Sequence, residues 1–248
     1  MHILIGIDDT DNLEFGATGQ VAMKLSRQVE KKGWGRSSAL TRHQLLIHPD
    51  IPYTSHNSSM CFGADIDEGR LDELIDFARE FIVRERAEGS EPGLCVAVPG
   101  RLPHPELLVE FGFQAKQIVL SKQEAFDLAE WLGIHLSEHG GDGQGVIGAL
   151  AGTGLRLSGN DGRTQGKLDI VSSNDIISVG DLLAQGQADQ VMSLEGTVLG
   201  DDELIELGEF LKNALLGGKF VFMVCPADQD TSEGIRWQSC SREQMKVF

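Results

Sequence analysis

The feature that most constrains this chain is a short apolar run that ends directly in a cluster of carboxylates. Residues 3–7 form the apolar run, and Asp8, Asp9 and Asp11 follow it within four residues. A run of this length that is bounded by turn residues is typical of a buried strand. The carboxyl ends of strands in parallel α/β sheets are also where such proteins bind ligands. A solvated acidic turn is the alternative interpretation of the same residues.

The close spacing of the three carboxylates favours a cation. Ionised groups this close repel one another, and each resists burial. A hard cation such as Mg²⁺ relieves both effects, since it is held by a few carboxylates together with phosphate oxygens. The sequence therefore predicts Asp8, Asp9 and Asp11 as metal ligands and catalytic residues.

A loop of small residues and a helix follow the carboxylates. Gly16 and Gly19 would let a backbone approach a ligand closely, and residues 20–32 have apolar side chains at helical spacing. The start of a helix offers free N–H groups to phosphate. Thr18 would either contact the phosphate or serve as an ordinary N-cap residue. Nucleotide phosphoryl transfer needs carboxylates beside an anion-binding helix start. Gly16, Thr18 and Gly19 are therefore predicted to bind the nucleotide, and Thr18 is also predicted to be catalytic.

A second segment rich in glycine lies at residues 140–166. It contains a helix-like apolar stretch at residues 145–155. Its small residues allow either tight packing of a helix on a sheet or the approach of a phosphate. Because a glycine pattern alone does not decide between these, Gly143 and Gly145 are kept as candidate cofactor-binding residues.

Four segments, taken in order, resemble the archaeal tRNA(Ile) agmatidine (2-agmatinylcytidine) synthetases. They are the opening residues 6–11, residues 49–57, which resemble N-P-x-I-P-Y/W and T-R-G-N, residues 91–94, which resemble N-P-G-hydrophobic, and residues 143–151, which resemble G-x-G-I-I-G-A-L-A. The resemblance covers roughly the first 165 residues, a span that fits one or two compact units.

This resemblance implies an ATP- and Mg²⁺-dependent kinase-like domain followed by a ferredoxin-like domain. In that family, ATP phosphorylates a cytidine carbonyl oxygen, and the amine agmatine then displaces the phosphate. The resemblance places the three aspartates in the metal and ATP site. It also matches Thr18 to a threonine that the family phosphorylates.

The sequence thus predicts an α/β fold in three parts. Residues 1–88 would form an ATP/Mg-binding kinase-like α/β domain, and residues 89–166 a ferredoxin-like α+β domain. Residues 167–248 would form a small C-terminal α/β extension, which lies outside the resemblance. Within this extension, apolar spacing predicts a helix at residues 201–216.

Shorter patterns occur between these parts. Ser121 and Glu124 form a capping box for a helix that ends before Gly133, and residues 118–120 are predicted as a short strand. The run at residues 135–139 matches the zinc-protease pattern H-x-x-E-H. Because glycines flank this run, we expect a frayed helix end there rather than a zinc site.

The charge of the chain argues against nucleic acid. The formal net charge is −17, from 38 acidic and 21 basic residues, whereas phosphate binding requires clustered Lys and Arg. The four cysteines form no C-x-x-C pair, so the zinc ribbon of the resembling family is not visible. Binding of tRNA by the isolated chain is therefore not expected. The predicted acceptor is a small molecule or nucleoside, with an amine as a further substrate, and a homo-oligomer is compatible with the sequence.

The start of the chain shows no basic n-region or cleavage site, and no stretch of about 18 apolar residues occurs. A cytoplasmic protein without a membrane partner is therefore expected. The predicted function is an ATP- and Mg²⁺-dependent phosphotransferase or ligase that activates a carbonyl or hydroxyl by phosphorylation. A non-catalytic nucleotide-binding regulatory or interaction module is the alternative.

Overall fold

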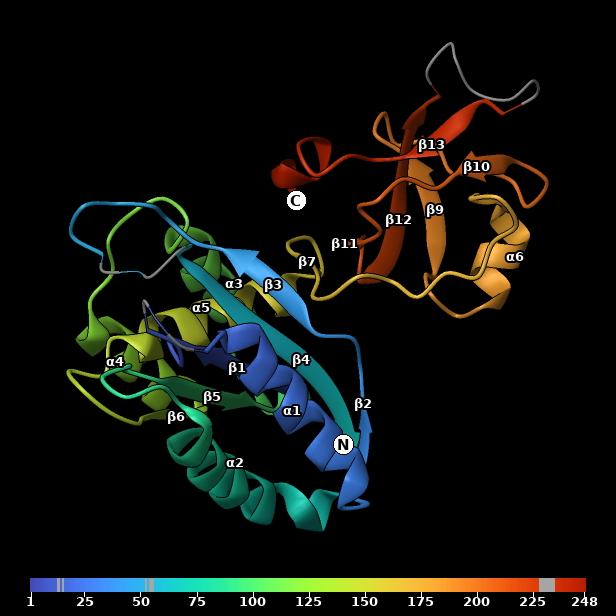
Figure 1. The fold of residues 1–248 in the computed structure, drawn as a ribbon. Helices are drawn as coiled ribbons and strands as arrows, with labels where there is room; N and C mark the ends of the chain where they lie inside the picture. The colour runs from blue at the N-terminus through green and yellow to red at the C-terminus, as the bar shows by residue number, and fades with distance from the viewer. Residues whose placement is uncertain (13, 15, 52, 54–55, 228–234) are drawn as a thin grey trace. The chain divides into compact units, whose positions relative to one another are not determined.

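The computed structural model describes residues 1–12, 14, 16–51, 53, 56–227 and 235–248. Leu13 and Phe15 of the acidic loop lie outside the described residues, as do Pro52, Thr54 and Ser55 of the resembling segment 49–57. The chain divides into two compact units, Met1–Ser158 and Gly159–Phe248. Their helices and strands are labelled in Figure 1.

The first unit is built around an antiparallel sheet. In sheet order its strands are β6 (His135–Glu138), β5 (Gly93–Ala97), β1 (His2–Asp8), β4 (Ser58–Ile66) and β3 (Thr41–Gln44), and β2 (Gly35–Ser37) also pairs with β4. The acidic strand β1 is central, and it runs antiparallel to both of its neighbours. The rule that ligands bind at the carboxyl ends of strands in parallel sheets therefore does not apply to the acidic end of β1.

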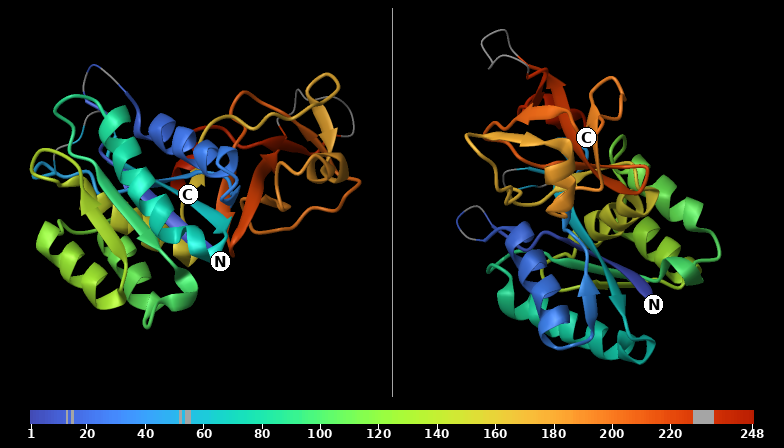
Figure 2. Two further views of the ribbon diagram at one scale, coloured as in Figure 1. Left: turned by 90° about the horizontal axis from the view of Figure 1, so that it is seen from below. Right: turned by 90° about the vertical axis from the view of Figure 1, so that its right-hand side faces the viewer.

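Helices cover both faces of this sheet (Figure 2). On one face lie α1 (Thr18–Lys31) and α2 (Leu71–Glu85), and on the other lie α3 (Pro105–Gln114), α4 (Lys122–Leu132) and α5 (Gly145–Ser158). Short 3-10 helices occupy Glu68–Arg70 and Pro99–Arg101. Side chains alternate between the two faces along β1. Ile3, Ile5 and Ile7 pack with α1 and α2, whereas the residues between them face α5.

The element order of the first unit includes a ferredoxin-like βαββαβ arrangement. β1, α1, β3, β4, α2 and β5 follow one another in the chain, and the sheet order is β5-β1-β4-β3. This arrangement spans residues 2–97, whereas the sequence placed the ferredoxin-like part at residues 89–166. The difference arises because β5 lies beyond residue 88 and yet pairs with β1. The mixed α/β fold class is confirmed, while the roles of the three predicted domains stay predictions.

Glycines let α5 lie very close to the sheet. A Cβ atom added to Gly93 of β5 would lie 2.3 Å from the carbonyl carbon of Gly145. A Cβ atom added to Gly6 of β1 would lie 2.2 Å from Thr153 Oγ1. Neither position has room for a side chain. Tight helix packing, one of the two interpretations of this glycine-rich segment, is thus present in the structure.

The second unit is a smaller α/β unit. Its sheet order is β7 (Arg163–Thr164), β11 (Asn213–Leu216), β12 (Lys219–Pro226), β13 (Trp237–Ser239), β10 (Leu204–Glu206) and β8 (Ile176–Ser178). β9 (Gln190–Ser193) pairs with β12 in parallel. α6 (Val179–Ala184) and a 3-10 helix at Gln244–Val247 belong to the same unit. Ile177, Leu182 and Phe222 are buried in its apolar core.

Several predicted elements differ from the structure. The helix predicted at residues 201–216 is wrong, because this segment contains the strands β10 and β11. The strand predicted at residues 118–120 is not formed, and the helix α3 was not predicted. The capping box of α4 is confirmed, with both hydrogen bonds between Ser121 and Glu124 present and Gly133 in a left-handed conformation.

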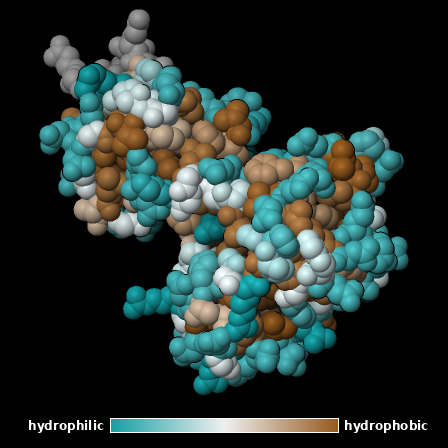
Figure 3. Space-filling view, turned by 180° about the vertical axis from the view of Figure 1, so that it is seen from behind, coloured by the Kyte–Doolittle hydropathy of each residue, from teal (hydrophilic) through white to brown (hydrophobic). Residues whose placement is uncertain are grey.

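No helix in the described ranges is long and apolar enough to cross a membrane. The face shown in Figure 3 is largely hydrophilic, with apolar residues scattered among the polar ones. The exposed apolar residues include Ile118, Trp131 and Val171. Scattered exposure of this kind is normal for a folded protein.

Candidate functional site

Asp8 ends β1 on the face of the sheet that packs against α5. A Cβ atom added to Gly148 of that helix would lie 1.6 Å from Asp8 Oδ2, so the carboxylate occupies the space of a missing side chain. Burial, followed by the charge of Asp9, raises the pKa of Asp8 well above its usual value. The backbone N–H of Asp9 donates a 2.9 Å hydrogen bond to Asp8 Oδ1, which acts in the opposite direction. The site therefore disfavours the bare anion.

Asp9 begins the acidic loop with a left-handed backbone. Its φ is 56°, a value that Asp and Asn adopt more often than other residues apart from glycine. Burial, followed by the charges of Glu91 and Asp11, raises the pKa of Asp9 to about 6. A hydrogen bond from the backbone of Glu91 lowers it in part. Two neighbouring carboxyl groups at the end of β1 are thus destabilised as anions.

Thr18 is the first residue of α1 and joins this helix to the acidic loop. Its hydroxyl donates a 2.8 Å hydrogen bond to Asp11 Oδ1 and accepts one of 3.2 Å from the backbone N–H of Thr10. The N-cap residue is Ala17, which makes no side-chain capping bond, and the first turn contains no acidic residue. The interpretation of Thr18 as an N-cap is therefore wrong. Its hydroxyl interacts with the loop instead.

Two of the glycines predicted to bind the nucleotide lie at this junction. Gly16 has a φ of 91°, and a Cβ atom added to it would lie 3.3 Å from Asp11 Cβ. Gly19 is buried in the first turn of α1. Both lie beside the acidic loop, and their contact with a nucleotide stays a prediction.

The other two predicted glycines lie at the start of α5. A Cβ atom added to Gly145 would lie 3.1 Å from the backbone oxygen of Asp8, so this residue is close to the carboxylates. Gly143 has a φ of 70° and lies against the side chain of Glu138. The structure thus brings Gly145 to the acidic end of β1, whereas Gly143 is packed against β6.

Glu91 is a further carboxylate at this site that the sequence analysis did not single out. Its carboxylate accepts a 3.2 Å hydrogen bond from the N–H of Gln144, and its carbonyl accepts one of 3.1 Å from Gly145. It reaches the site because Gly93, the first residue of β5, pairs with Asp8. An acidic residue just before a second buried strand was the available signal.

The carboxylates do not form a metal site by themselves. Among the residues that the structure describes, no three His, Cys, Asp or Glu side chains gather closely enough to hold a metal ion. The assignment of Asp8, Asp9 and Asp11 as metal ligands therefore stays a prediction that needs further donors. Their hard oxygen donors suit Mg²⁺ when phosphate oxygens complete its coordination.

Asp9→Asn should stabilise the first unit at pH 7 in the absence of metal. The pKa of about 6 in the folded protein lies above the ordinary 3.8, so the contribution of Asp9 to stability falls as the pH rises through this window. We expect a gain of about 1 kcal/mol at neutral pH, most of which is lost near pH 4. Thermal unfolding in a chelator at both pH values measures it. An equal gain at both would contradict this origin.

The two histidines of the zinc-protease pattern are not at a helix end. His135 is the first residue of strand β6, and His139 directly follows the last one, so the expectation of a frayed helix is wrong. Ser137 Oγ lies 3.0 Å from His135 Nε2 and 2.9 Å from His139 Nε2, and these three side chains share one face. Glu138 lies on the other face and pairs with Lys122. The zinc chemistry needs a helix with the histidines on one face, which this strand does not provide.

No family model matches the chain. A tRNA 2-agmatinylcytidine synthetase, TiaS, from Pyrobaculum neutrophilum is 28% identical over 158 residues, which are 62% of this chain and 35% of that protein. The corresponding enzyme from Archaeoglobus fulgidus is 32% identical over 162 residues, or 63% of this chain and 36% of that protein. The chain therefore spans about a third of the length of these relatives.

Solved structures give the same relationship. A crystal structure of TiaS in complex with an isoleucine tRNA and ATP matches with a TM-score of 0.55 and 29% identity, over 62% of this chain and 36% of that one. The complex of TiaS with the same tRNA, AMPCPP and agmatine matches with a TM-score of 0.53 and 28% identity, over the same shares. These sequence and fold matches therefore make the chain a relative of the ATP-using enzymes that modify tRNA. Specifically, the chain is homologous over 62% of its length to the tRNA(Ile) agmatidine synthetases.

These comparisons correct the prediction about nucleic acid. Binding of tRNA was not expected because the net charge is −17, but the related enzymes have been solved in complex with an isoleucine tRNA. The net charge sums over a whole surface, so it does not report the local potential where a nucleic acid binds. The expectation was therefore wrong.

Proposed function

We propose that the first unit binds ATP with Mg²⁺ at the acidic end of β1 and uses it to phosphorylate a nucleoside oxygen in tRNA. The observation that carries this proposal is the junction of β1, the acidic loop and α1. There, Asp8 and Asp9 resist ionisation, and α1 begins without a side-chain cap. A divalent cation and a phosphate bound together would suit both features.

Each residue of the junction has a proposed role. Asp8 and Asp9 would hold Mg²⁺ together with phosphate oxygens, since this ion rarely relies on protein ligands alone. The first N–H groups of α1 would bind phosphate, with Gly16 and Gly19 leaving room for it. Gly145 would contribute from the start of α5. ATP supplies the phosphoryl group when it is bound.

Thr18 and Asp11 are proposed to act as an acceptor and its base. The Thr18 hydroxyl already donates to Asp11 Oδ1 at 2.8 Å, so Asp11 is positioned to take the proton when the hydroxyl oxygen bonds to phosphorus. Thr18 is 6% exposed. Transfer therefore requires a rearrangement at Thr18 that exposes its hydroxyl to the phosphate.

The final acceptor is proposed to be a carbonyl or hydroxyl oxygen of a nucleoside in tRNA, with an amine as the second substrate. The support comes from the related enzymes, which have been solved with an isoleucine tRNA, ATP or AMPCPP, and agmatine. This chain spans about a third of their length. Binding of ATP and reaction with tRNA therefore need separate tests.

ATP should bind more tightly with Mg²⁺ than without it. Asp8→Asn should reduce this ratio of the two affinities by about tenfold. The substitution keeps the shape of the side chain against Gly148 and removes its charge. Isothermal titration calorimetry with and without Mg²⁺ measures the coupling. Asp127→Asn, on the exposed side of α4, is the control for the loss of one negative charge. Equal affinities of wild type and Asp8→Asn for ATP with Mg²⁺ would reject the assignment.

Incubation with γ-labelled ATP, Mg²⁺, a tRNA transcript and an amine tests the reaction. Transfer of the label, or ATP turnover that depends on tRNA, would support an enzyme. Confirmed ATP binding without turnover under these conditions would favour the alternative, a non-catalytic nucleotide-binding module.

A further inference from the structure

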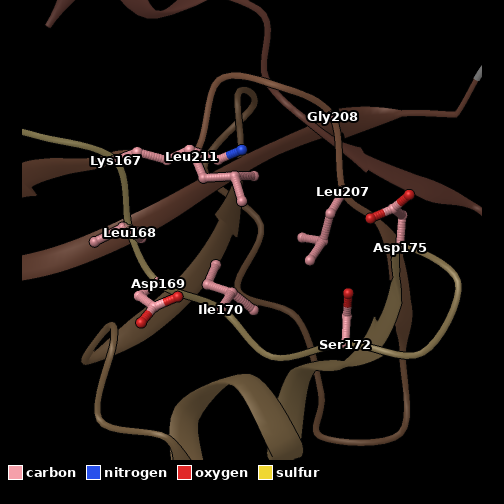
Figure 4. Close-up of a pocket in the computed structure, with 9 residues that line it drawn as sticks. All are labelled: Lys167, Leu168, Asp169, Ile170, Ser172, Asp175, Leu207, Gly208 and Leu211. Atoms are coloured by element: carbon pink, nitrogen blue, oxygen red, sulfur yellow. The ribbon is translucent and has the colours of Figure 1, made fainter.

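The second unit contains a cavity of about 480 Å³ (Figure 4). It lies between the segment after β7 and the segment that joins β10 to β11. Its lining residues are Lys167, Leu168, Asp169, Ile170, Ser172, Asp175, Leu207, Gly208 and Leu211. All of them belong to the second unit. The cavity is therefore separate from the acidic end of β1.

Part of the wall of this cavity is aliphatic, and backbone hydrogen bonds hold it in place. Its aliphatic side chains come from Leu168, Ile170, Leu207 and Leu211. The N–H of Leu168 donates to the carbonyl of Leu211 at 3.0 Å, and the N–H of Leu207 donates to the carbonyl of Asp175 at 2.7 Å. These bonds tie the two sides of the cavity together, so the aliphatic surface is preformed.

Two carboxylates flank this aliphatic surface. In Figure 4, Asp169 and Asp175 lie on opposite sides of Ile170 and Leu207. Within the described ranges, neither carboxylate takes part in a hydrogen bond or an ion pair. Lys167 is the positively charged residue of the lining. Together with Asp169 and Asp175 it gives the cavity a net charge of −1.

The backbone at Asp175 forms a tight turn beside the cavity. Asn174 and Asp175 have φ values of 53° and 60°, and they form the two-residue turn between Ser173 and Ile176, which bridge each other. Turns of this kind usually have glycine at the second position, because a side chain there is strained. This turn places Asp175 in the lining of the cavity.

We propose that this cavity binds an aliphatic amine with a cationic group at each end, such as a linear diamine. The methylene chain would lie along the leucine and isoleucine side chains, where burial of apolar surface is favourable. Its two ammonium groups would face Asp169 and Asp175, which are on opposite sides of the cavity. This proposal does not depend on the function proposed for the first unit.

Titration of the full-length protein with 1,5-diaminopentane, followed by NMR of the backbone amides, tests the proposal. We expect saturable shifts at Leu168, Gly208 and their neighbours. Asp169→Asn and Asp175→Asn should each weaken binding by about threefold to fivefold, as is typical of an exposed charge pair. Asp202→Asn, which removes a charge outside the cavity, should leave the affinity unchanged.

Asp175→Gly separates the loss of a ligand contact from a loss of folding. This change should raise the thermal unfolding temperature because it relieves the left-handed conformation, and it should weaken diamine binding as much as Asp175→Asn does. Equal binding of 1-pentanol or pentanedioate would overturn the proposal, since neither carries a positive charge. An equal effect of Asp202→Asn would overturn it as well, because the attraction would then be non-specific.

Discussion

Gly93→Ala should destabilise the first unit by about 3 kcal/mol or more, which is the upper end of the range for overpacking a core. The added Cβ atom would lie 2.3 Å from both the carbonyl carbon and the carbonyl oxygen of Gly145. These are backbone atoms, so no change of rotamer can relieve the contact. α5 would have to move away from β5, and the acidic end of β1 would lose its cover. Thermal unfolding should show a drop of about 6–12 °C.

Gly100→Ala is the matched control for this substitution. A Cβ atom added to Gly100 would meet no atom within 4 Å. Its unfolding temperature should therefore stay close to that of the wild type. If Gly93→Ala unfolds at the same temperature as Gly100→Ala, the close contact between β5 and α5 is not as the structure describes it.

Thr18→Val should abolish the phosphorylation of the protein itself that we expect in ATP and Mg²⁺ without an acceptor. The substitution removes the hydroxyl at nearly constant volume, while the backbone N–H groups of α1 that would bind phosphate remain. Because valine has no oxygen that can bond to phosphorus, the label at position 18 should be lost completely. ATP affinity should change little. Intact-mass spectrometry and calorimetry measure the two quantities.

Ser26→Ala is the control for removing a hydroxyl from the same helix. The Ser26 hydroxyl donates to the carbonyl of Met23, away from the acidic loop. Its phosphorylation should equal that of the wild type. Phosphate on another residue of the wild type would keep the kinase interpretation and reject the role of Thr18.

The local features of the first unit could be predicted from the sequence. An apolar run that ends in aspartates predicted the strand β1, and apolar spacing predicted α1 from residue 20, two residues after its observed start at Thr18. Ser121 and Glu124 predicted the start of α4 because a capping box is a contact between residues three apart. Such signals involve only neighbours in the chain, so one sequence is enough to read them.

The failure at residues 201–216 has the opposite cause. Apolar residues here are spaced so that they fit a helix, but the first part pairs with β8 and β13, and the last part pairs with β7 and β12. Hydrogen bonds to distant strands override a weak local preference. Ile205 is fully buried in the strand that results. The available strand partners, which the sequence does not reveal, decided the structure of this segment.

The candidate site shows the same division. The three aspartates and Thr18 are close in the chain, and the sequence singled them out as candidates. Glu91 and Gly148 reach the same place through the pairing of β5 with β1 and through the packing of α5. Glu91 shortly precedes a buried strand and Gly148 lies in the glycine-rich segment, but neither local pattern places these residues at the end of β1. The part of the site that depends on long-range contacts therefore required the structure.

The pairing of Asp8 with Gly93 also sets the order in which the site is completed during synthesis. β1 leaves the ribosome before its neighbour β5 and well before the covering helix α5, which ends at Ser158. Contacts between segments so distant in sequence form slowly, because a long loop must lose conformational entropy before the contacts can stabilise it. In the nascent chain, the Asp8 carboxylate therefore stays hydrated until α5 packs against the end of β1.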